Sequence, residues 1–231
     1  MKYRAWINRV CWAVLVYMGF WHVAVAEERP ASEGSWVRVV DQPDLGLTID
    51  TRAMQGTNVR EFRGETVVKA TLASLMATIQ DTERVPQWMP HVAKVTLVSP
   101  DKDQHSEIYL VIHVPWPLHD RDAFVDVRWS QDASTHAVHM VGRSRMAGAG
   151  LQVGCVRMPE MDMDWTFTPL GHGKVRVVFR GFGLPGGVVP NWAANLVVTE
   201  LPEGSLKHLQ AQVDLPRHQR VSMPGLVEPQ N

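Results

Sequence analysis

The chain has 231 residues, of which 45% are hydrophobic and 20% are charged, and its formal net charge is −1. This is the composition of a globular protein, and the length suits one large domain or two small ones. The sequence has no Lys/Arg run that would neutralise phosphates, which argues against a nucleic-acid partner.

Residues 1–26 have the pattern of a secretory signal peptide. Lys2, Arg4 and Arg9 form a positive start, residues 10–21 are apolar, and Ala24-Val25-Ala26 is a small-x-small cleavage pattern. The apolar stretch is shorter than the about 20 residues of a membrane span. We therefore expect cleavage after Ala26 and a periplasmic or secreted protein, with an uncleaved N-terminal anchor as the alternative.

The two cysteines bear on disulfide bonding. Cys11 lies in the leader, so the mature chain keeps Cys155 alone and an intrachain disulfide is excluded. Cys155 stands among valines, a context typical of a small buried side chain.

The first elements after the leader are two strands and a helix. Residues 45–52 alternate apolar and polar side chains with the period of a half-buried strand, and a second strand follows at 58–68. Thr71 is placed to cap a helix that ends near Asp81 and carries its apolar residues on one face. A short helical turn at 81–90 is interrupted by prolines.

The rest of the chain predicts an antiparallel sheet and one long helix. Strand patterns occupy 94–114 (a hairpin), 120–129, 135–146, 161–170 and 173–182, and their short connections favour antiparallel pairing. A helix is expected from Pro190 to Val213, kinked or split at Pro202, followed by a disordered tail at 214–231.

This order predicts an α+β fold in which a curled antiparallel sheet wraps a C-terminal helix and leaves a hydrophobic pocket between them. For each pocket candidate the alternative is plain core packing. The cavity candidates are Trp88, Tyr109, Ile112, Arg121, Val125, Val127, Met140, Met163, Trp165, Phe167, Trp192 and Leu196.

Four segments resemble the START lipid-transfer domains in their compact bacterial form. They are GETVVKATLASLMATIQDTERVPQWMPHV, YLVIHVPWPLHDRD, CVRMPEMDMDWTFTPLGHGKVRVVF and PGGVVPNWAANLVVTELPEGSLKHL. The resemblance runs roughly from Trp36 to Val213. It implies a helix-grip domain at 27–213 that binds or moves a lipid or another apolar molecule in a cavity under the last helix, with no cofactor.

The stretch HVPWPLHDRD, residues 113–122, has three interpretations. His113, His119, Asp120 and Asp122 are zinc-ligand types, but the sequence has no second cluster at ligand spacing. A hydrolase site needs an activated nucleophile, and the context of Ser144 lacks the second glycine of a nucleophile elbow.

The third interpretation is architectural. Pro115 and Pro117 end a strand because they cannot donate to a sheet ladder. Alternation places Arg121 on the inward face with Ala123 and Val125, where we expect a structural salt bridge, with a ligand head group as the alternative. Sterol-binding START proteins carry a buried acid and arginine, whereas Arg128 here is expected to face outward. The ligand therefore stays open between sterols, acyl chains and other apolar molecules.

Three functions fit these features. The first is a non-catalytic exported lipid carrier with transient membrane contact, gated by the helix at Pro202 and by the loop at 183–187. The second is a cyclase/aromatase-type enzyme of the same fold that acts on a hydrophobic, polyketide-like substrate. Convergence of two or more of His113, Tyr109 and Arg121 in the cavity would favour it. The third is an interaction domain whose interior is packed solid.

Overall fold

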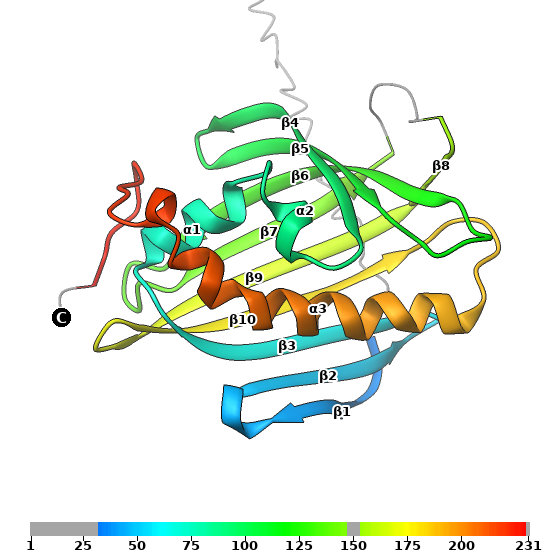
Figure 1. Ribbon diagram of the computed structural model, residues 1–231, viewed down its shortest axis with the longest axis horizontal. Helices are drawn as coiled ribbons and strands as arrows, with labels where there is room; N and C mark the ends of the chain where they lie inside the picture. The colour runs from blue at the N-terminus through cyan, green and yellow to red at the C-terminus, as the bar shows by residue number, and fades with distance from the viewer. Residues whose placement is uncertain (1–31, 147–152, 230–231) are drawn as a thin grey trace, which may run out of the picture.

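The computed structural model describes residues 32–146 and 153–229, so the predicted signal peptide and Cys11 lie outside the described residues. Ten strands form one sheet, in the order β1-β2-β3-β10-β9-β7-β6-β5-β4, with β8 paired to β6 (Figure 1). The strands are β1 (Ser32–Gln42), β2 (Leu47–Met54), β3 (Arg60–Lys69), β4 (Val92–Lys102), β5 (His105–Ile112), β6 (Asp120–Gln131), β7 (Val138–Arg145), β8 (Cys155–Arg157), β9 (Glu160–Gly171) and β10 (Lys174–Leu184).

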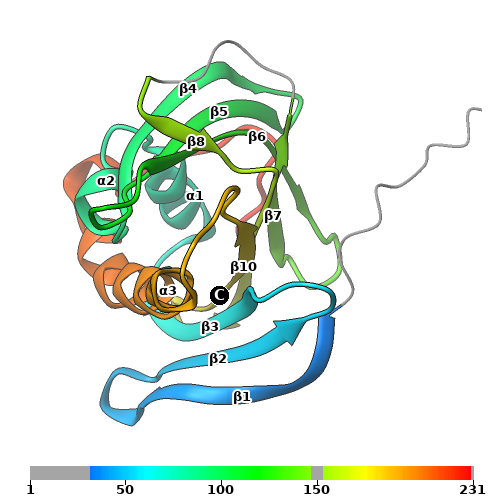
Figure 2. The same cartoon turned by 90° about the vertical axis from the view of Figure 1, so that its right-hand side faces the viewer.

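The helices close the open side of this sheet. They are α1 (Leu72–Gln80), α2 (Val85–Trp88) and α3 (Asn191–Val213), with two 3-10 turns, η1 (Pro43–Leu45) and η2 (Pro216–His218). Seen along its edge, the sheet bends into an arc, and the three helices lie across the opening of the arc (Figure 2). The predicted α+β helix-grip fold is confirmed.

Three elements differ from the sequence-based expectation. Residues 32–42 form the edge strand β1, which precedes the first strand that we expected. The strand expected at 45 begins at Leu47, because Pro43–Leu45 forms a 3-10 turn that ends at Gly46 with a left-handed φ of 56°. The short strand β8 was not predicted, and it pairs with β6 in parallel, so the sheet is not purely antiparallel.

The long helix α3 packs closely against the other helices. It runs through Pro202 as one helix of 23 residues, and Pro190 is its N-cap rather than its first helical residue. At Gly204 a Cβ atom would lie 2.3 Å from Cγ of Pro90, so only glycine permits this approach of α3 to the segment after α2. No helix among the described residues is long and apolar enough to cross a membrane.

The tail corrects our expectation of disorder at 214–231, because residues 214–229 are described and pack on the domain. His218 is 3% exposed, and its Nε2 lies 2.9 Å from Oδ2 of Asp81 at the end of α1. Glu228 accepts hydrogen bonds from the first amides of α1, those of Leu72 and Ala73. These polar contacts hold the tail at both ends of α1. A prediction from the composition of the tail does not reveal them.

Candidate ligand cavity

A cavity lies between the concave face of the sheet and the helices, and it has two lobes. The Arg121 lobe has a volume of about 90 Å³. Apart from Arg121 and Asp162, its lining is apolar or glycine and comes from the sheet, from the loop after β10 and from α3. Its lining includes Ile112, Val114, Arg121, Met161, Pro185 and Leu201.

The second lobe, which we call the Trp165 lobe, has a volume of about 220 Å³ and lies toward α1 and α2. Its lining includes Ile79, Val85, Leu97, Val127, Met140 and Trp165. The two lobes share the side chains of Met89, Val92, Leu110 and Met163, so they adjoin. Methionine adapts its shape readily, so Met89 and Met163 form a deformable wall between the lobes.

The structure places six of the twelve candidates in the cavity lining. The lining residues among them are Ile112, Arg121, Val127, Met140, Met163 and Trp165, with Met163 in both lobes. Three more candidates are buried in the core and line neither lobe, which agrees with plain core packing. They are Trp88, Val125 and Phe167. Trp192 and Leu196 lie on α3, but their side chains are outside the described residues.

Tyr109 is a correction, because it faces away from the cavity. Its hydroxyl donates to Oδ2 of Asp122 at 2.7 Å, and its ring lies 4.9 Å from that of Phe124. Asp122 is fully buried and also accepts two hydrogen bonds from Arg157 of β8. This cluster links the side chains of β6 to those of β8, the strand that pairs beside it. Alternation along β5 puts Tyr109 on the face opposite to Ile112.

Arg121 lies on the inward face, as alternation predicted, but its contacts differ from the expected salt bridge. Its side chain is buried, and no carboxylate of the described residues lies within 4 Å of its nitrogens. It donates instead to three backbone carbonyls, those of His119, Pro185 and Gly186. Burial lowers the pKa of its guanidinium, which the nearby Asp120 partly offsets.

Arg121 therefore links the two loops at this end of the cavity, residues 113–119 and 183–187. The second loop needs glycine at position 186, where φ is 63° and a Cβ atom would lie 2.7 Å from the carbonyl oxygen of Arg157. In the first loop Oδ1 of Asp120 accepts from the amide of Val114 and lies 3.0 Å from Nδ1 of His113. The stretch at 113–122 thus closes a loop, as its architectural interpretation predicted.

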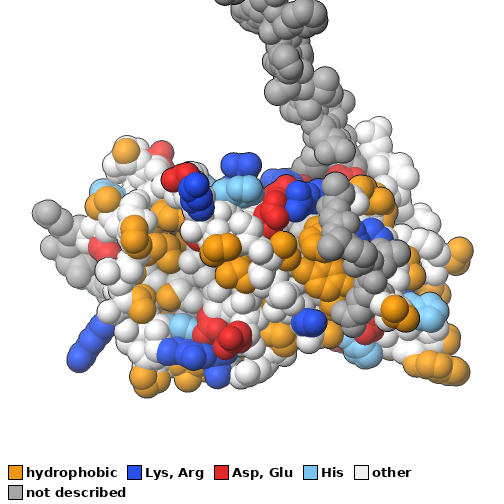
Figure 3. Space-filling model, turned by 90° about the horizontal axis from the view of Figure 1, so that it is seen from above, with side chains coloured by type: hydrophobic (Ala, Val, Ile, Leu, Met, Phe, Trp, Pro, Cys, Tyr) orange, Lys and Arg blue, Asp and Glu red, His pale blue; other side chains and the backbone are white. Residues whose placement is uncertain are grey.

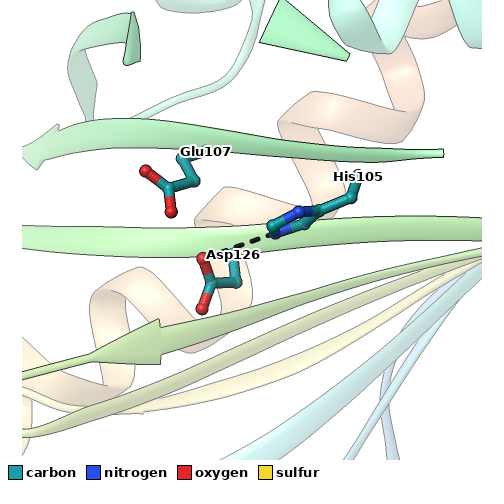
Figure 4. Close-up of side chains that lie close together, drawn as sticks. All are labelled: His105, Glu107 and Asp126. Carbon is teal, nitrogen blue, oxygen red and sulfur yellow. Dashed lines mark ion pairs between the residues drawn. The ribbon is translucent and has the colours of Figure 1, made fainter. Parts of the chain in front are cut away.

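Potential metal ligands gather elsewhere, on β5 and β6. His105, Glu107 and Asp126 offer ligand atoms within 4.8 Å of one another, and Figure 4 shows the three side chains together. Arg145 occupies this group, with Nη2 at 2.8 Å from Glu107 and Nε at 3.8 Å from Asp126. Its charge compensates the two carboxylates, as in an ordinary ion pair near the surface. The face of the molecule shown in Figure 3 likewise has positive, negative and hydrophobic side chains interspersed.

Cys155 on β8 pairs with Asp120 of β6 and is half-buried. Burial raises the pKa of its thiol, and the carboxylates of Asp122 and Asp120 raise it further. A raised pKa keeps the thiol protonated, which is the opposite of nucleophile activation.

Sequence reasoning missed part of the lining. The Arg121 lobe is also lined by five residues that were not candidates, namely Phe62, Met158, Met161, Val189 and Leu201. The alternation of β9 carried a signal for Met161, which shares a face with Met163. Val189 follows the loop at 183–187, and only the tertiary closure of that loop brings it to the cavity.

The chain matches known proteins over most of its length. Residues 68–203 match the family described as "Polyketide cyclase / dehydrase and lipid transport". A crystal structure of a STAR-related lipid transfer protein (fragment 25-204) from Xanthomonas axonopodis is 30% identical, with a TM-score of 0.70, covering 79% of this chain and 100% of that chain.

Two further relatives are more distant. The phosphatidylcholine transfer protein of Homo sapiens is 24% identical over 181 residues, which is 76% of this chain and 83% of that protein. The structure of human STARD10 is 14% identical, with a TM-score of 0.66, and covers 78% of this chain and 74% of that one. The chain therefore belongs to the polyketide cyclase/dehydrase and lipid transport family, and its relatives within that family are START-like proteins.

Proposed function

We propose that this protein is an exported, non-catalytic carrier that binds a lipid or another hydrophobic molecule and transfers it between membranes. The observation that carries the proposal is the pair of adjoining apolar lobes under α3. Burial of apolar surface contributes on the order of 25 cal/mol per Å², so a hydrocarbon chain in these lobes is held without specific chemistry. The family and the lipid transfer proteins among its relatives support the same role.

The non-catalytic part of the proposal rests on the cavity lining. A cyclase-type enzyme of this fold would need polar groups that converge on its substrate. Of His113, Tyr109 and Arg121, only Arg121 lines the cavity. The His113 side chain is 63% exposed, and Tyr109 bonds Asp122 on the outer face.

Membrane contact is assigned to the two loops that Arg121 joins. Trp116 in the first loop is 89% exposed, and Val188, just after the second, is 93% exposed. Tryptophan favours the boundary between water and hydrocarbon, because its ring is apolar and its indole N–H is polar. Insertion of these side chains into a bilayer would place the Arg121 lobe beside the donor or acceptor lipid.

The proposal is tested by native mass spectrometry of the protein purified from the cell envelope of its own host. We expect a mass that begins at Glu27 and a bound molecule that is released unchanged and in stoichiometric amount. An empty protein that stays empty after incubation with host lipid extract would contradict binding. A full-length mass in the cytoplasmic fraction would contradict export, and chemical conversion of the released molecule would favour the enzyme.

Transfer and membrane contact need a separate measurement. Movement of a fluorescent lipid from donor to acceptor vesicles should speed up when the protein is added. Trp116→Ser should slow this transfer and weaken vesicle binding, whereas Val67→Ser, at an exposed position on β3, should do neither. Equal transfer by the Trp116 variant would remove the loop from the mechanism.

A further inference from the structure

Arg121 carries the one buried charge in its lobe that no acid neutralises within the described residues. The lobe has a second charged lining residue, Asp162, but Oδ2 of Asp162 lies 3.4 Å from Nε of Arg143. Asp120 is close enough to influence Arg121, but its Oδ1 faces His113 and Val114. A guanidinium stays charged in proteins, so Arg121 presents a positive charge to the contents of the lobe.

The hydrogen-bond count leaves room for a ligand. A guanidinium has five N–H donors, and the three carbonyl contacts use one each on Nε, Nη1 and Nη2. One N–H on Nη1 and one on Nη2 therefore remain without a partner among the described residues. Two N–H groups are the number that a carboxylate or phosphate uses in a bidentate contact with arginine.

The charge at the other end of the cavity gives the ligand a direction. The charged lining residue of the Trp165 lobe is Asp101, an exposed side chain on β4. It accepts hydrogen bonds from Trp129 Nε1 at 2.9 Å and from Gln80 Nε2 at 3.3 Å, and no cation pairs with it within 4 Å among the described residues. An anionic group is repelled from this end and attracted to the Arg121 end.

The volumes limit the number of hydrocarbon chains. A cavity of about 150 Å³ accommodates a molecule the size of benzene. Lobes of about 90 and 220 Å³ that meet at Met89 and Met163 therefore suit one chain that passes between them rather than two chains side by side.

We propose that the cavity takes a single-chain amphiphile with an anionic head group, whose head binds Arg121 and whose chain extends past Met89 and Met163 into the Trp165 lobe. This inference rests on the proposed carrier function and specifies its ligand class. The shared chemistry is a carboxylate or a phosphate on one acyl chain. Because the head also meets the guanidinium that holds Pro185 and Gly186, binding would keep the loop at 183–187 closed over it.

The test compares a charged probe with a neutral probe of the same chain length. Palmitate and 1-hexadecanol are titrated into the full-length protein below their aggregation limits, and dissociation constants are measured by calorimetry. A hydrogen bond to a charged group is worth about 1.5–3 kcal/mol, so wild type should bind palmitate at least about tenfold more tightly than the alcohol. This comparison needs no variant, so it stands even if a substitution impairs folding.

The variants then assign the preference to Arg121. In Arg121→Gln, palmitate should bind no more tightly than hexadecanol, while hexadecanol keeps its wild-type affinity within a few-fold. Arg128→Gln is the matched control, because Arg128 is an exposed arginine on the same strand, and it should keep the full preference.

The outcomes separate this inference from the proposed function. Equal binding of palmitate and hexadecanol by wild type would overturn the anionic head group but leave the hydrophobic carrier intact. Equal losses for both probes in Arg121→Gln would reduce Arg121 to a support for its loop. Tighter binding of dipalmitoylphosphatidylcholine than of palmitate would overturn the single chain. Failure of every probe and of host lipid extract would refute the carrier itself.

A lysophosphatidate with a palmitoyl chain distinguishes the two head groups. Stronger binding of palmitate would support a carboxylate head, and stronger binding of the lysophosphatidate would support a phosphate head. Either result supports the inference, provided that the preference over hexadecanol disappears in Arg121→Gln.

Discussion

Two groups of buried charge in this protein differ in how they are neutralised. On β2, β3 and β10, Glu61 is fully buried and receives hydrogen bonds from Arg52 and Arg180. The ring of Trp36 stacks beside these guanidinium groups, at 4.4 Å from Arg52 and 5.9 Å from Arg180. In the cavity, Arg121 is also buried, but its hydrogen-bond partners among the described residues are three backbone carbonyls.

This difference indicates that the Glu61 group stabilises the fold, whereas the charge of Arg121 is available to a ligand. The Glu61 group has opposite charges and cation–π contacts in place, so it needs nothing from outside the chain. Arg121 has no carboxylate within 4 Å of its nitrogens among the described residues, and it has spare donors beside an apolar cavity. Removing a member of each group should therefore give opposite results in stability and in binding.

The largest expected effect on stability comes from Glu61→Gln. The substitution leaves Arg52 and Arg180 without their shared carboxylate, and breaking a buried pair costs about 3–5 kcal/mol. Urea denaturation should show this loss in the free energy of unfolding, with palmitate affinity unchanged in the folded protein. Glu65→Gln is the control, because the pair of Glu65 with Arg176 is half exposed and should change stability by less than about 1 kcal/mol. Similar losses in both variants would show that burial of the pair is irrelevant.

Arg121→Met should destabilise the protein less and affect binding more. Three carbonyls lose a donor, which costs about 1–3 kcal/mol in total if water reaches part of the loop. The substitution also removes a buried charge that has no carboxylate within 4 Å among the described residues. The same urea measurement, with Arg128→Met as the control, tests this order. A loss larger than that of Glu61→Gln would mean that Arg121 serves mainly to hold the fold.

Val127→Phe tests the chain end of the cavity. Val127 lines the Trp165 lobe from β6, so the phenyl ring of the variant fills space in this lobe without overpacking a closed core. Stability should change by less than about 1.5 kcal/mol, and palmitate should weaken at least several-fold while an eight-carbon fatty acid keeps its affinity. Calorimetry with both acids measures the shift, and Val67→Phe on the exposed side of β3 should leave both unchanged. Uniform weakening of both acids would place the chain elsewhere.

How far the sequence predicts the site depends on whether strand alternation or tertiary contact decides each position. Alternation placed Arg121, Ile112 and Met163 on the inward face, because period two follows from strand geometry. Tyr109 was named a cavity candidate against this alternation, which puts it on the face opposite to Ile112, where its hydroxyl donates to Asp122. Alternation did not show that Arg121 meets Pro185, 64 residues away along the chain, because loop closure has no local signature. The tail was missed for the same reason: Glu228 and His218 find their partners only in the folded domain.

The smallest expected effect is the pH dependence of stability that comes from Asp50 on β2. Burial raises the pKa of Asp50, but hydrogen bonds from Arg38 and Arg63 outweigh it, so the pKa lies below its ordinary value of 3.8. The folded state therefore favours the carboxylate, and its contribution to stability is full above the unfolded pKa and disappears as pH falls through the folded one. Because Arg38 and Arg63 are partly exposed, Asp50→Asn should cost no more than about 1 kcal/mol at pH 7.

That difference between wild type and Asp50→Asn should shrink as the pH is lowered below about 4. Urea denaturation at pH 7, 5 and 3 follows it, with Asp41→Asn as a control whose exposed carboxylate lies 3.6 Å from the same Arg38. A difference in the free energy of unfolding that grows toward low pH would contradict a lowered pKa of Asp50 in the folded state. Unlike the head-group preference, it should be the same with and without palmitate, because Asp50 belongs to the charges that the fold neutralises by itself.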